Sequence, residues 1–271
     1  MKIRSVRLLY FSPTRTTKTI LENIAVGLSA DSVMHFDLTL PDMNRSAIPE
    51  MKEDELLIIG MPVYAGRVPE LAVPRFHKLK SGGNPAVLVV VYGNREYEDA
   101  LLELSDLVKA AGFVPIAGGA FIGEHSFSAR STPLSEGRPD ASDLRRAREF
   151  GVSIGQLLQS IQSIGKIRPL SLPGNRPFRA HANLPKTSPA TEKDRCTACG
   201  DCAAACPTGS ISIKIISGTR VETCILCCAC VKACPANARA LNDPAIGKII
   251  EWLDAITAER KEPQIFLGSN L

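Results

Sequence analysis

Short apolar runs alternate with amphipathic stretches from residue 1 to about residue 165. Apolar runs of strand length predict buried strands, and apolar positions spaced by three and four residues predict helices. The predicted strands are Val6 to Phe11, Val33 to Asp37, Leu56 to Gly60, Ala86 to Val91 and Phe113 to Phe121. The helical stripes run from Leu21 to Leu28, from Leu101 to Ala111 and from Leu144 to Ile161. This alternation predicts an α/β fold, a doubly wound parallel five-stranded sheet.

The pattern breaks down between Gly165 and Arg195, where five prolines interrupt a basic stretch. Such a composition predicts an extended connector that is laid over the surface and builds no regular structure. Its basic side chains are interpreted as a solvated face, with docking of a partner as the alternative. The arginines that this alternative concerns are Arg168, Arg176 and Arg179.

All nine cysteines lie between positions 196 and 234, and eight of them form the run C-x2-C-x2-C-x3-C-P twice, one period of 28 residues apart. The eight are Cys196, Cys199, Cys202, Cys206, Cys224, Cys227, Cys230 and Cys234. This run is typical of proteins with two [4Fe–4S] clusters, in which the fourth cysteine of each run binds the cluster of the other run. We therefore assign Cys234 to the cluster of the first run and Cys206 to the cluster of the second.

Two other interpretations of these cysteines fit their spacing and setting less well. A structural zinc site fills one tetrahedron with two C-x2-C hooks, which leaves the third close cysteine of each run without a role. Disulfides require an oxidising compartment. The ninth cysteine, Cys228, breaks the spacing. It is interpreted as a small hydrophobic residue near a cluster, with a ligand or a reactive thiol as the alternatives.

Composition narrows the function classes further. The 271 residues are 45% hydrophobic, which is enough for a substantial core, and the net charge is only +4. Because basic and acidic residues are mixed throughout, we expect no nucleic acid partner. The chain has no run of eighteen apolar residues, and no leader-like segment follows Met1. We expect no membrane contact and a cytoplasmic location, since a reducing interior keeps thiolates available for iron.

The first predicted strand leads into a loop of hydroxyl residues and one arginine. In an open parallel sheet, ligands bind beyond the carboxyl ends of the strands. Short hydroxyls and free amides at a helix start are suited to a phosphate group, whereas ordinary capping accounts for only one or two of them. The residues predicted to bind phosphate are Ser12, Thr14, Arg15, Thr16 and Thr17.

The third and fourth predicted strands also end in distinctive loops. Each loop places an aromatic side chain beside small, turn-forming residues, a combination suited to a flat ring, although either loop alone is a common surface turn. Together, the three loops favour flavin mononucleotide. The residues predicted to bind its ring are Pro62, Val63, Tyr64, Ala65 and Gly66 in one loop and Tyr92, Gly93, Asn94 and Tyr97 in the other.

Residues 1–165 resemble a flavodoxin-type FMN-binding domain, and residues 190–242 are similar to bacterial dicluster ferredoxins. The whole chain resembles the flavodoxin–ferredoxin fusion proteins of anaerobic prokaryotes, which the segments at 92–97 and 123–128 resemble as well. One departure stands out, because Arg15 occupies a position where simple flavodoxins commonly have glycine. The path of the phosphate loop or its ligand is therefore expected to differ.

Four segments divide the chain on this interpretation. They are a flavodoxin-like domain at 1–165, a connector at 166–190, a 2[4Fe–4S] ferredoxin domain, small and α+β, at 191–242, and a C-terminal helix and tail at 243–271. The helix is expected because Asp243 and Pro244 are typical of a helix start, and an apolar stripe runs from Ile246 to Ile256.

A long loop from Gly123 to Asp140 is rich in Ser, Pro and Gly. It is long enough to close over a small substrate or to contact the ferredoxin domain. Within it, His125 is interpreted as a hydrogen-bonded loop residue, with proton delivery to a flavin as the alternative.

The first functional hypothesis is an electron carrier with two [4Fe–4S] clusters and FMN. It would relay low-potential electrons between redox protein partners that exchange one or two electrons. The second hypothesis is a flavin-dependent reductase, an oxidoreductase whose ferredoxin domain feeds electrons to FMN for reduction of a small molecule. No acid–base pair or nucleophile in the sequence names such a reaction, so no catalytic residue is predicted. A regulatory protein that senses oxygen is the third hypothesis, and the sequence contains no recognisable output module for it.

Overall fold

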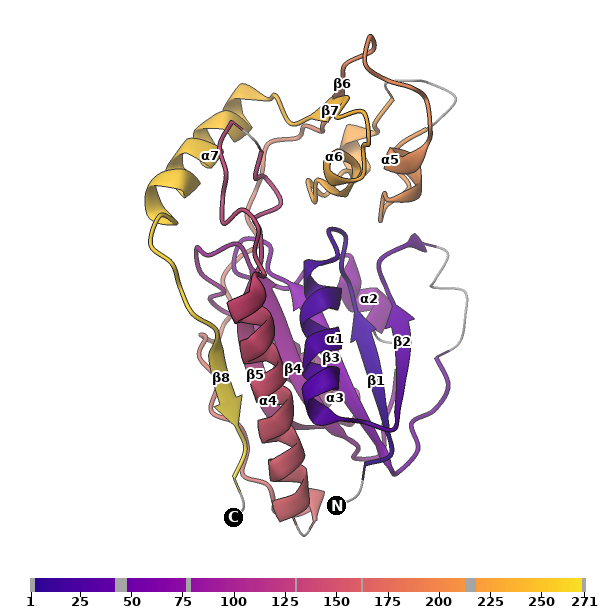
Figure 1. The fold of residues 1–271 in the computed structure, drawn as a ribbon, viewed down its shortest axis with the longest axis vertical. Helices are drawn as coiled ribbons and strands as arrows, with labels where there is room; N and C mark the ends of the chain where they lie inside the picture. Colours follow the sequence, from indigo (N-terminus) through magenta and orange to yellow (C-terminus); the bar gives the residue numbers. More distant parts are fainter. Residues whose placement is uncertain are drawn as a thin grey trace.

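A computed structural model describes residues 3–41, 48–76, 79–129, 131–161, 163–212 and 218–269. Its larger part is built on a six-stranded sheet with the order β2-β1-β3-β4-β5-β8 (Figure 1). The strands are β1 (Ser5–Tyr10), β2 (Ser32–Asp37), β3 (Glu55–Pro62), β4 (Pro85–Tyr92), β5 (Val114–Ile122) and β8 (Gln264–Leu267). The first five strands are parallel, and their order is that of flavodoxin-like doubly wound sheets. The predicted fold class is thereby confirmed.

Two layers of helices cover the sheet (Figure 1). The helices are α1 (Thr16–Leu28), α2 (Ala72–Phe76), α3 (Ala100–Ala110) and α4 (Ala141–Ser160). Ile20 and Ile24 of α1 share one hydrophobic cluster with Phe150 and Ile154 of α4, so α1 and α4 lie on the same face. Glycine permits this packing, because a Cβ at Gly151 would lie 2.1 Å from the carbonyl oxygen of Ile24.

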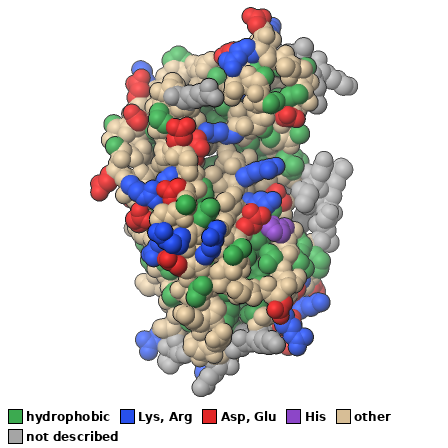
Figure 2. Space-filling view, in the orientation of Figure 1, with side chains coloured by type: hydrophobic (Ala, Val, Ile, Leu, Met, Phe, Trp, Pro, Cys, Tyr) green, Lys and Arg blue, Asp and Glu red, His purple; other side chains and the backbone are tan. Residues whose placement is uncertain are grey.

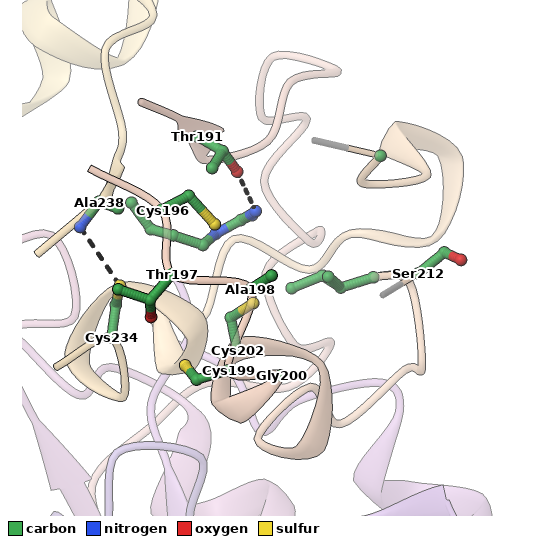
Figure 3. Close-up of a pocket in the computed structure, with 13 residues that line it drawn as sticks. Thr191, Cys196, Thr197, Ala198, Cys199, Gly200, Cys202, Ser212, Cys234 and Ala238 are labelled. Atoms are coloured by element: carbon green, nitrogen blue, oxygen red, sulfur yellow. Dashed lines mark hydrogen bonds between the residues drawn. The ribbon is translucent and has the colours of Figure 1, made fainter. Parts of the chain in front are cut away.

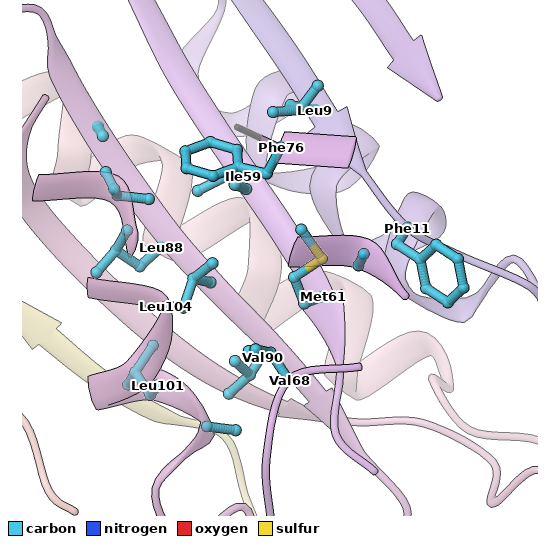
Figure 4. Packing of buried hydrophobic residues seen from close by; sticks show 14 of the residues in the cluster. Leu9, Phe11, Ile59, Met61, Val68, Phe76, Leu88, Val90, Leu101 and Leu104 are labelled. Carbon is cyan, nitrogen blue, oxygen red and sulfur yellow. The ribbon is translucent and has the colours of Figure 1, made fainter. Parts of the chain in front are cut away.

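The opposite face carries a second hydrophobic cluster, to which α2 and α3 contribute (Figure 4). Leu9, Ile59 and Leu88 from three adjacent strands pack there with Phe76 of α2 and Leu104 of α3. All eight residues of β4 are buried, because its side chains meet a helical layer on both faces of the sheet. The continuous apolar runs of the sequence therefore mark the central strands.

The sixth strand comes from the far end of the chain. Strand β8 pairs antiparallel with β5, with Ala117 opposite Leu267 and Ala120 opposite Gln264. Four residues that follow a polar segment give too short a pattern to predict a strand, so β8 adds to the five strands that the sequence predicts. The helix that precedes it, α7 (Pro244–Ile256), is predicted, and the Asp243 side chain caps it by accepting from the amide of Ala245 at 2.8 Å.

The connector runs across the α3 side of the sheet, as an extended segment. Both carboxylate oxygens of Asp99 accept backbone amides from it, that of Asn175 at 2.8 Å and that of Arg179 at 2.7 Å. Arg176 pairs with Asp106 at 2.6 Å, and the Arg179 side chain pairs with Glu98. These two arginines are therefore engaged by the chain itself.

The cysteine-rich region forms a small domain over the carboxyl ends of the parallel strands (Figure 1). Its elements are the antiparallel strands β6 (Ala190–Thr191) and β7 (Arg239–Ala240) and the short helices α5 (Asp201–Ala204) and α6 (Ala229–Lys232). Short 3-10 helices occur at Ile164–Lys166 and Val221–Thr223. Basic and acidic side chains are interspersed on the face shown in Figure 2. Within the described ranges, no helix is long and apolar enough to cross a membrane.

Candidate functional site

The eight predicted ligands line two cavities in the small domain. One cavity, partly open to solvent, is lined by the first cysteine set, which comprises Cys196, Cys199, Cys202 and Cys234 (Figure 3). The other is lined by the second cysteine set, which comprises Cys206, Cys224, Cys227 and Cys230. Each set thus joins three cysteines of one run to the fourth cysteine of the other. The four thiols of each set are the donors that a [4Fe–4S] cluster requires, and Cys228 lines the second cavity as a fifth cysteine.

The backbone of the two runs repeats as the sequence does. Ala198 and Leu226, one period apart, both have a φ of 54° in the left-handed region. The amide of Ser210 donates to the sulfur of Cys206 at 3.3 Å, and the equivalent amide of Ala238 donates to the sulfur of Cys234 at 3.2 Å. Such amides stabilise negative charge on a thiolate and tune the potential of a bound cluster.

The two sets differ in their exposure. Cys199 of the first set is exposed, whereas Cys227 and Cys230 of the second are each 8% exposed. Burial raises the pKa of the Cys227 thiol to about 12. That thiol therefore keeps its proton at neutral pH until a metal replaces it.

The second set faces the sheet domain. Ile225, which lines its cavity, packs against the hydrophobic cluster on the α2 and α3 face. The buried guanidinium of Arg75 in α2 donates to the carbonyl of Pro207 at 2.7 Å, directly after the ligand Cys206. Burial raises the pKa of Tyr64 well above 10, and the nearby Cys227 and Cys228 act in the same direction. The loop after β3 thus lies close to this cavity.

The ninth cysteine lies at the same boundary. Cys228 is 3% exposed, and its thiol donates to the carbonyl of Leu226 at 3.7 Å. It is the N-cap of α6 with a φ of 55°, and its counterpart in the first run is Gly200 with a φ of 89°. A left-handed position is natural for glycine and uncommon for cysteine.

The predicted phosphate loop surrounds the start of α1. The N-cap residue Arg15 has a φ of 66°, so it adopts the left-handed conformation that glycine favours at this position. The Ser12 side chain accepts from the Lys18 amide at 3.1 Å, and the Thr14 and Thr16 hydroxyls are 3.4 Å apart. The Arg15 side chain itself does not cap the helix, and the first turn of α1 contains no acidic residue.

One hydroxyl of this loop lacks a partner. Thr17 is fully buried, and its Oγ1 has no hydrogen bond partner among the described residues. An unsatisfied buried hydroxyl costs about 1–3 kcal/mol. Together with a helix start that its N-cap residue Arg15 does not cap, this hydroxyl is a donor that an anion such as a phosphate group satisfies, so these residues fit the phosphate of FMN.

The loop after β3 forms a tight turn at the same edge of the sheet. It begins at Pro62, the last residue of β3, and the Val63 amide donates to the carbonyl of Val91 at 2.8 Å. Tyr64 and Arg67 exchange both backbone hydrogen bonds, while Ala65 and Gly66 between them have φ values of 50° and 83°. Tyr64 in this turn packs against the same hydrophobic cluster as Ile225, which lines the cavity of the second cysteine set.

The loop after β4 is instead bound by the C-terminal tail. Tyr92 and Tyr97 are each 4% exposed and lie with their ring centres 5.4 Å apart inside the core of the sheet. The Tyr97 hydroxyl donates to Gln264 at 2.5 Å. The Asn94 amide donates to the carbonyls of Thr257 and Glu259, each at 2.8 Å. Tyr92 and Tyr97 therefore do not line an open ring site, and the tail lies over Asn94.

The long loop at 123–140 contacts the small domain. Lys232 of α6 pairs with Glu124 and donates to the carbonyl of Ser128 at 3.0 Å. His125 lies over Gly93, where a Cβ would be 2.3 Å from the imidazole ring, and its Nδ1 accepts from the Phe127 amide at 3.1 Å. Burial lowers the pKa of His125 to about 4, with Arg95 and Lys232 contributing. The imidazole is therefore neutral at pH 7.

Two buried arginines at this site were not anticipated from the sequence. Arg75 reaches the carbonyl beside Cys206, and Arg239 lines the cavity of the first set. Aligning the two cysteine runs gives a signal for Arg239, because its counterpart one period earlier is Ile211. No comparable signal points to Arg75, which is isolated in an ordinary helical segment.

Comparison with known proteins agrees with this division. Residues 188–235 match the family described as the 4Fe-4S dicluster domain. No curated protein matches the chain. Among solved structures, an archaeal flavodoxin is 16% identical, with a TM-score of 0.37, and the match covers 57% of this chain and 99% of that chain.

Two further flavodoxins give similar matches. Oxidised Flavodoxin 1 from Bacillus cereus is 13% identical with a TM-score of 0.41, covering 58% of this chain and 99% of that one. A mutant flavodoxin from Fusobacterium nucleatum bound to flavin mononucleotide is 16% identical with a TM-score of 0.37, covering 55% and 94%. The fold assignment rests on the strand order itself. The chain combines a parallel sheet in the flavodoxin-like order with a 4Fe-4S dicluster domain, an electron-transfer domain whose eight-cysteine pattern implies two [4Fe–4S] clusters.

Proposed function

We propose that this protein is an electron carrier with two [4Fe–4S] clusters and FMN, which relays low-potential electrons between one-electron and two-electron partners. When bound, the clusters supply one-electron chemistry and the flavin supplies one- or two-electron chemistry. The observation that carries the proposal is the position of the second cysteine set. Ile225 at its cavity packs against the same hydrophobic cluster as Tyr64, whose loop follows β3 at the edge of the sheet where the phosphate loop also lies.

The difference in exposure supports an order for the relay. Cys199 places the first set at the surface, where a redox protein partner can approach. Cys227 and Cys230 place the second set in the interior, toward the sheet domain. The chain thus offers an outer site for exchange with a partner and an inner site for exchange with a flavin.

The contacts between the domains support a fixed path. Lys232 joins the second run of the dicluster domain to the sheet domain, and Arg75 joins the end of the first run to it. The connector enters the dicluster domain from one side, and the tail returns from it to form β8 at the edge of the sheet. The dicluster domain is thus attached to the sheet domain at both ends and contacts it in between. Its distance from the sheet is therefore fixed, and electron transfer needs no docking step.

The phosphate loop supports the flavin part of the proposal. The Thr17 hydroxyl is buried without a partner among the described residues, and the N-cap residue Arg15 makes no side-chain hydrogen bond to the first turn of α1. Arg15 adds a positive charge at the rim of the same loop. A phosphate monoester satisfies the hydroxyl, the helix dipole and the charge together.

Counting the cofactors of anaerobically purified protein tests this proposal. We expect about eight irons and one flavin per chain. Protein that contains iron but binds no flavin after FMN is added would refute the flavin site and leave the dicluster domain intact.

A pair of variants tests the phosphate loop. Thr17→Val removes the buried hydroxyl at nearly constant volume and should weaken FMN binding about tenfold or more, since hydrogen bonds to charged groups contribute about 1.5–3 kcal/mol. It should also raise the thermal stability of flavin-free protein, because no unsatisfied hydroxyl remains. Thr19→Val is the matched control, since the Thr19 hydroxyl already donates to the carbonyl of Arg15 at 3.1 Å. Equal FMN affinity in both variants contradicts the assignment.

A further inference from the structure

Two buried arginines lack a carboxylate partner within the part of the chain that the structure describes. Arg7 and Arg138, which are also buried, are paired with Glu55 and Asp143. Arg75 and Arg239 are 6% and 5% exposed and make no such pair among the described residues. A buried charge without a counter-charge is costly, so an anion that completes the site is expected near each.

The groups that hydrogen-bond the Arg239 guanidinium are uncharged. Its Nη1 donates to the Thr191 hydroxyl at 2.8 Å, and its Nη2 donates to the Pro189 carbonyl at 2.9 Å and to the Thr219 hydroxyl at 2.8 Å. Its Nε is buried and has no partner among the described residues. These contacts hold the guanidinium in place, but none of them neutralises it.

The guanidinium lies between the two cysteine sets. Arg239 lines the cavity of the first set, whose members include Cys202. The two groups that accept from its Nη2, the Pro189 carbonyl and the Thr219 hydroxyl, belong to residues that line the cavity of the second set. The guanidinium thus lines one cavity and is hydrogen-bonded to the wall of the other.

The internal repeat makes this position distinctive. The counterpart of Arg239 in the first run is Ile211, an apolar residue that lines both cavities. An apolar residue is what packing around a cluster requires, and the charge is therefore an addition that only one half of the domain carries.

We propose that Arg239 is the shared counter-charge of both [4Fe–4S] clusters and raises the reduction potential of each. Four thiolates leave a cluster with net negative charge, and reduction adds one more negative charge, so a fixed cation stabilises the reduced form more than the oxidised form. Arg239 acts as a positioning residue through this field. The inference rests on the two clusters of the proposed relay and not on its flavin.

Potentiometric titration of the whole protein, followed by electron paramagnetic resonance, tests the inference. Arg239→Gln should lower the reduction potential of each cluster by about 59 mV. This shift corresponds to a change of about tenfold in the equilibrium constant for one-electron reduction. Arg239→Lys keeps the charge and should retain most of both potentials. Arg195→Gln is the control, because Arg195 is an exposed arginine of the same domain that is already paired with Glu192 at 3.1 Å.

Iron content separates the possible outcomes. If Arg239→Gln retains both clusters at unchanged potentials, the inference is overturned. If Arg239→Gln loses clusters while Arg239→Lys keeps them at near-native potentials, the positive charge is required and the inference stands. Loss of clusters, or lowered potentials, in both variants shows that the hydrogen bonds and not the charge matter, and overturns it. A wild-type protein without about eight irons refutes the clusters themselves, which is a separate failure.

Discussion

Cys199 and Cys227 occupy equivalent positions in the two halves of the dicluster domain, yet Cys199 is exposed and Cys227 is buried. The halves share their cysteine spacing, their left-handed turns and their amide-to-sulfur hydrogen bonds. They differ in what surrounds them, because the second half meets the sheet domain through Ile225 and Lys232. The local sequence thus builds two alike sites, and tertiary packing gives them different exposure to solvent.

Removing one ligand of the second set should have the largest effect on this comparison. Cys206 lies in the first run but lines the second cavity. Cys206→Ala should therefore reduce the iron content from about eight to about four and spare the first cluster. Cys228→Ala is the control and should keep about eight irons. Loss of the first cluster with the second intact would show that the cysteines are grouped within each run.

A difference in solvent access should separate the two clusters in wild-type protein. An iron chelator that acts from the solvent should remove iron in two phases. The faster phase should belong to the first set, because Cys199 is exposed. Absorbance of the released iron complex measures both phases. The Cys206→Ala variant identifies them, since it should show the fast phase alone, and a single slow phase there would reverse the assignment.

Loosening the second half should make the two halves more alike. Lys232→Met removes the ion pair with Glu124 and the hydrogen bond to the Ser128 carbonyl. A partly exposed pair contributes about 1 kcal/mol, so iron release from the second set should be about fivefold faster. Lys193→Met, at an exposed position before the first run, is the matched control. An unchanged slow phase in Lys232→Met would show that this contact does not shield the cluster.

The change that bears least on the difference between the two clusters concerns the turn that begins each short helix. Gly200→Ala places a Cβ at a φ of 89° and should lower the thermal midpoint, at a cost of about 1–2 kcal/mol. Gly247→Ala is the matched control, because a Cβ there meets nothing within 4 Å. An alanine inside α7 should stabilise the protein by about 0.5–1 kcal/mol and so raise the thermal midpoint. Shifts of the same sign in both variants would contradict the role of the left-handed turn.

The sequence predicts the five parallel strands because their apolar runs are buried on both faces, as in β4. It does not predict β8, whose four residues form a strand only because the edge of β5 is available to them. The cysteine spacing identifies the dicluster domain, because each cysteine motif is a short local pattern in the sequence. By contrast, the position of Arg239 between the two cysteine sets depends on its hydrogen bonds to Thr191 of β6 and to Thr219, which are distant from Arg239 in the sequence.

The candidate flavin site shows the same division between local and distant contacts. The Ser12 to Thr17 segment lies at the start of α1, as its hydroxyls predict. By contrast, Tyr97 and Asn94 are held by residues more than 160 positions away, Gln264 and Thr257, so their burial follows from the path of the tail. A local pattern of aromatic and turn residues carries no information about such a partner.

Stoichiometric reduction of the whole protein tests the central claim most directly. A measured reductant is added anaerobically to cofactor-loaded protein, and the visible spectrum is followed until it no longer changes. The account predicts about four electrons per chain, one for each cluster and two for the flavin. An end point at two electrons, with no flavin bands before or after addition of FMN, would contradict the relay between one-electron and two-electron partners.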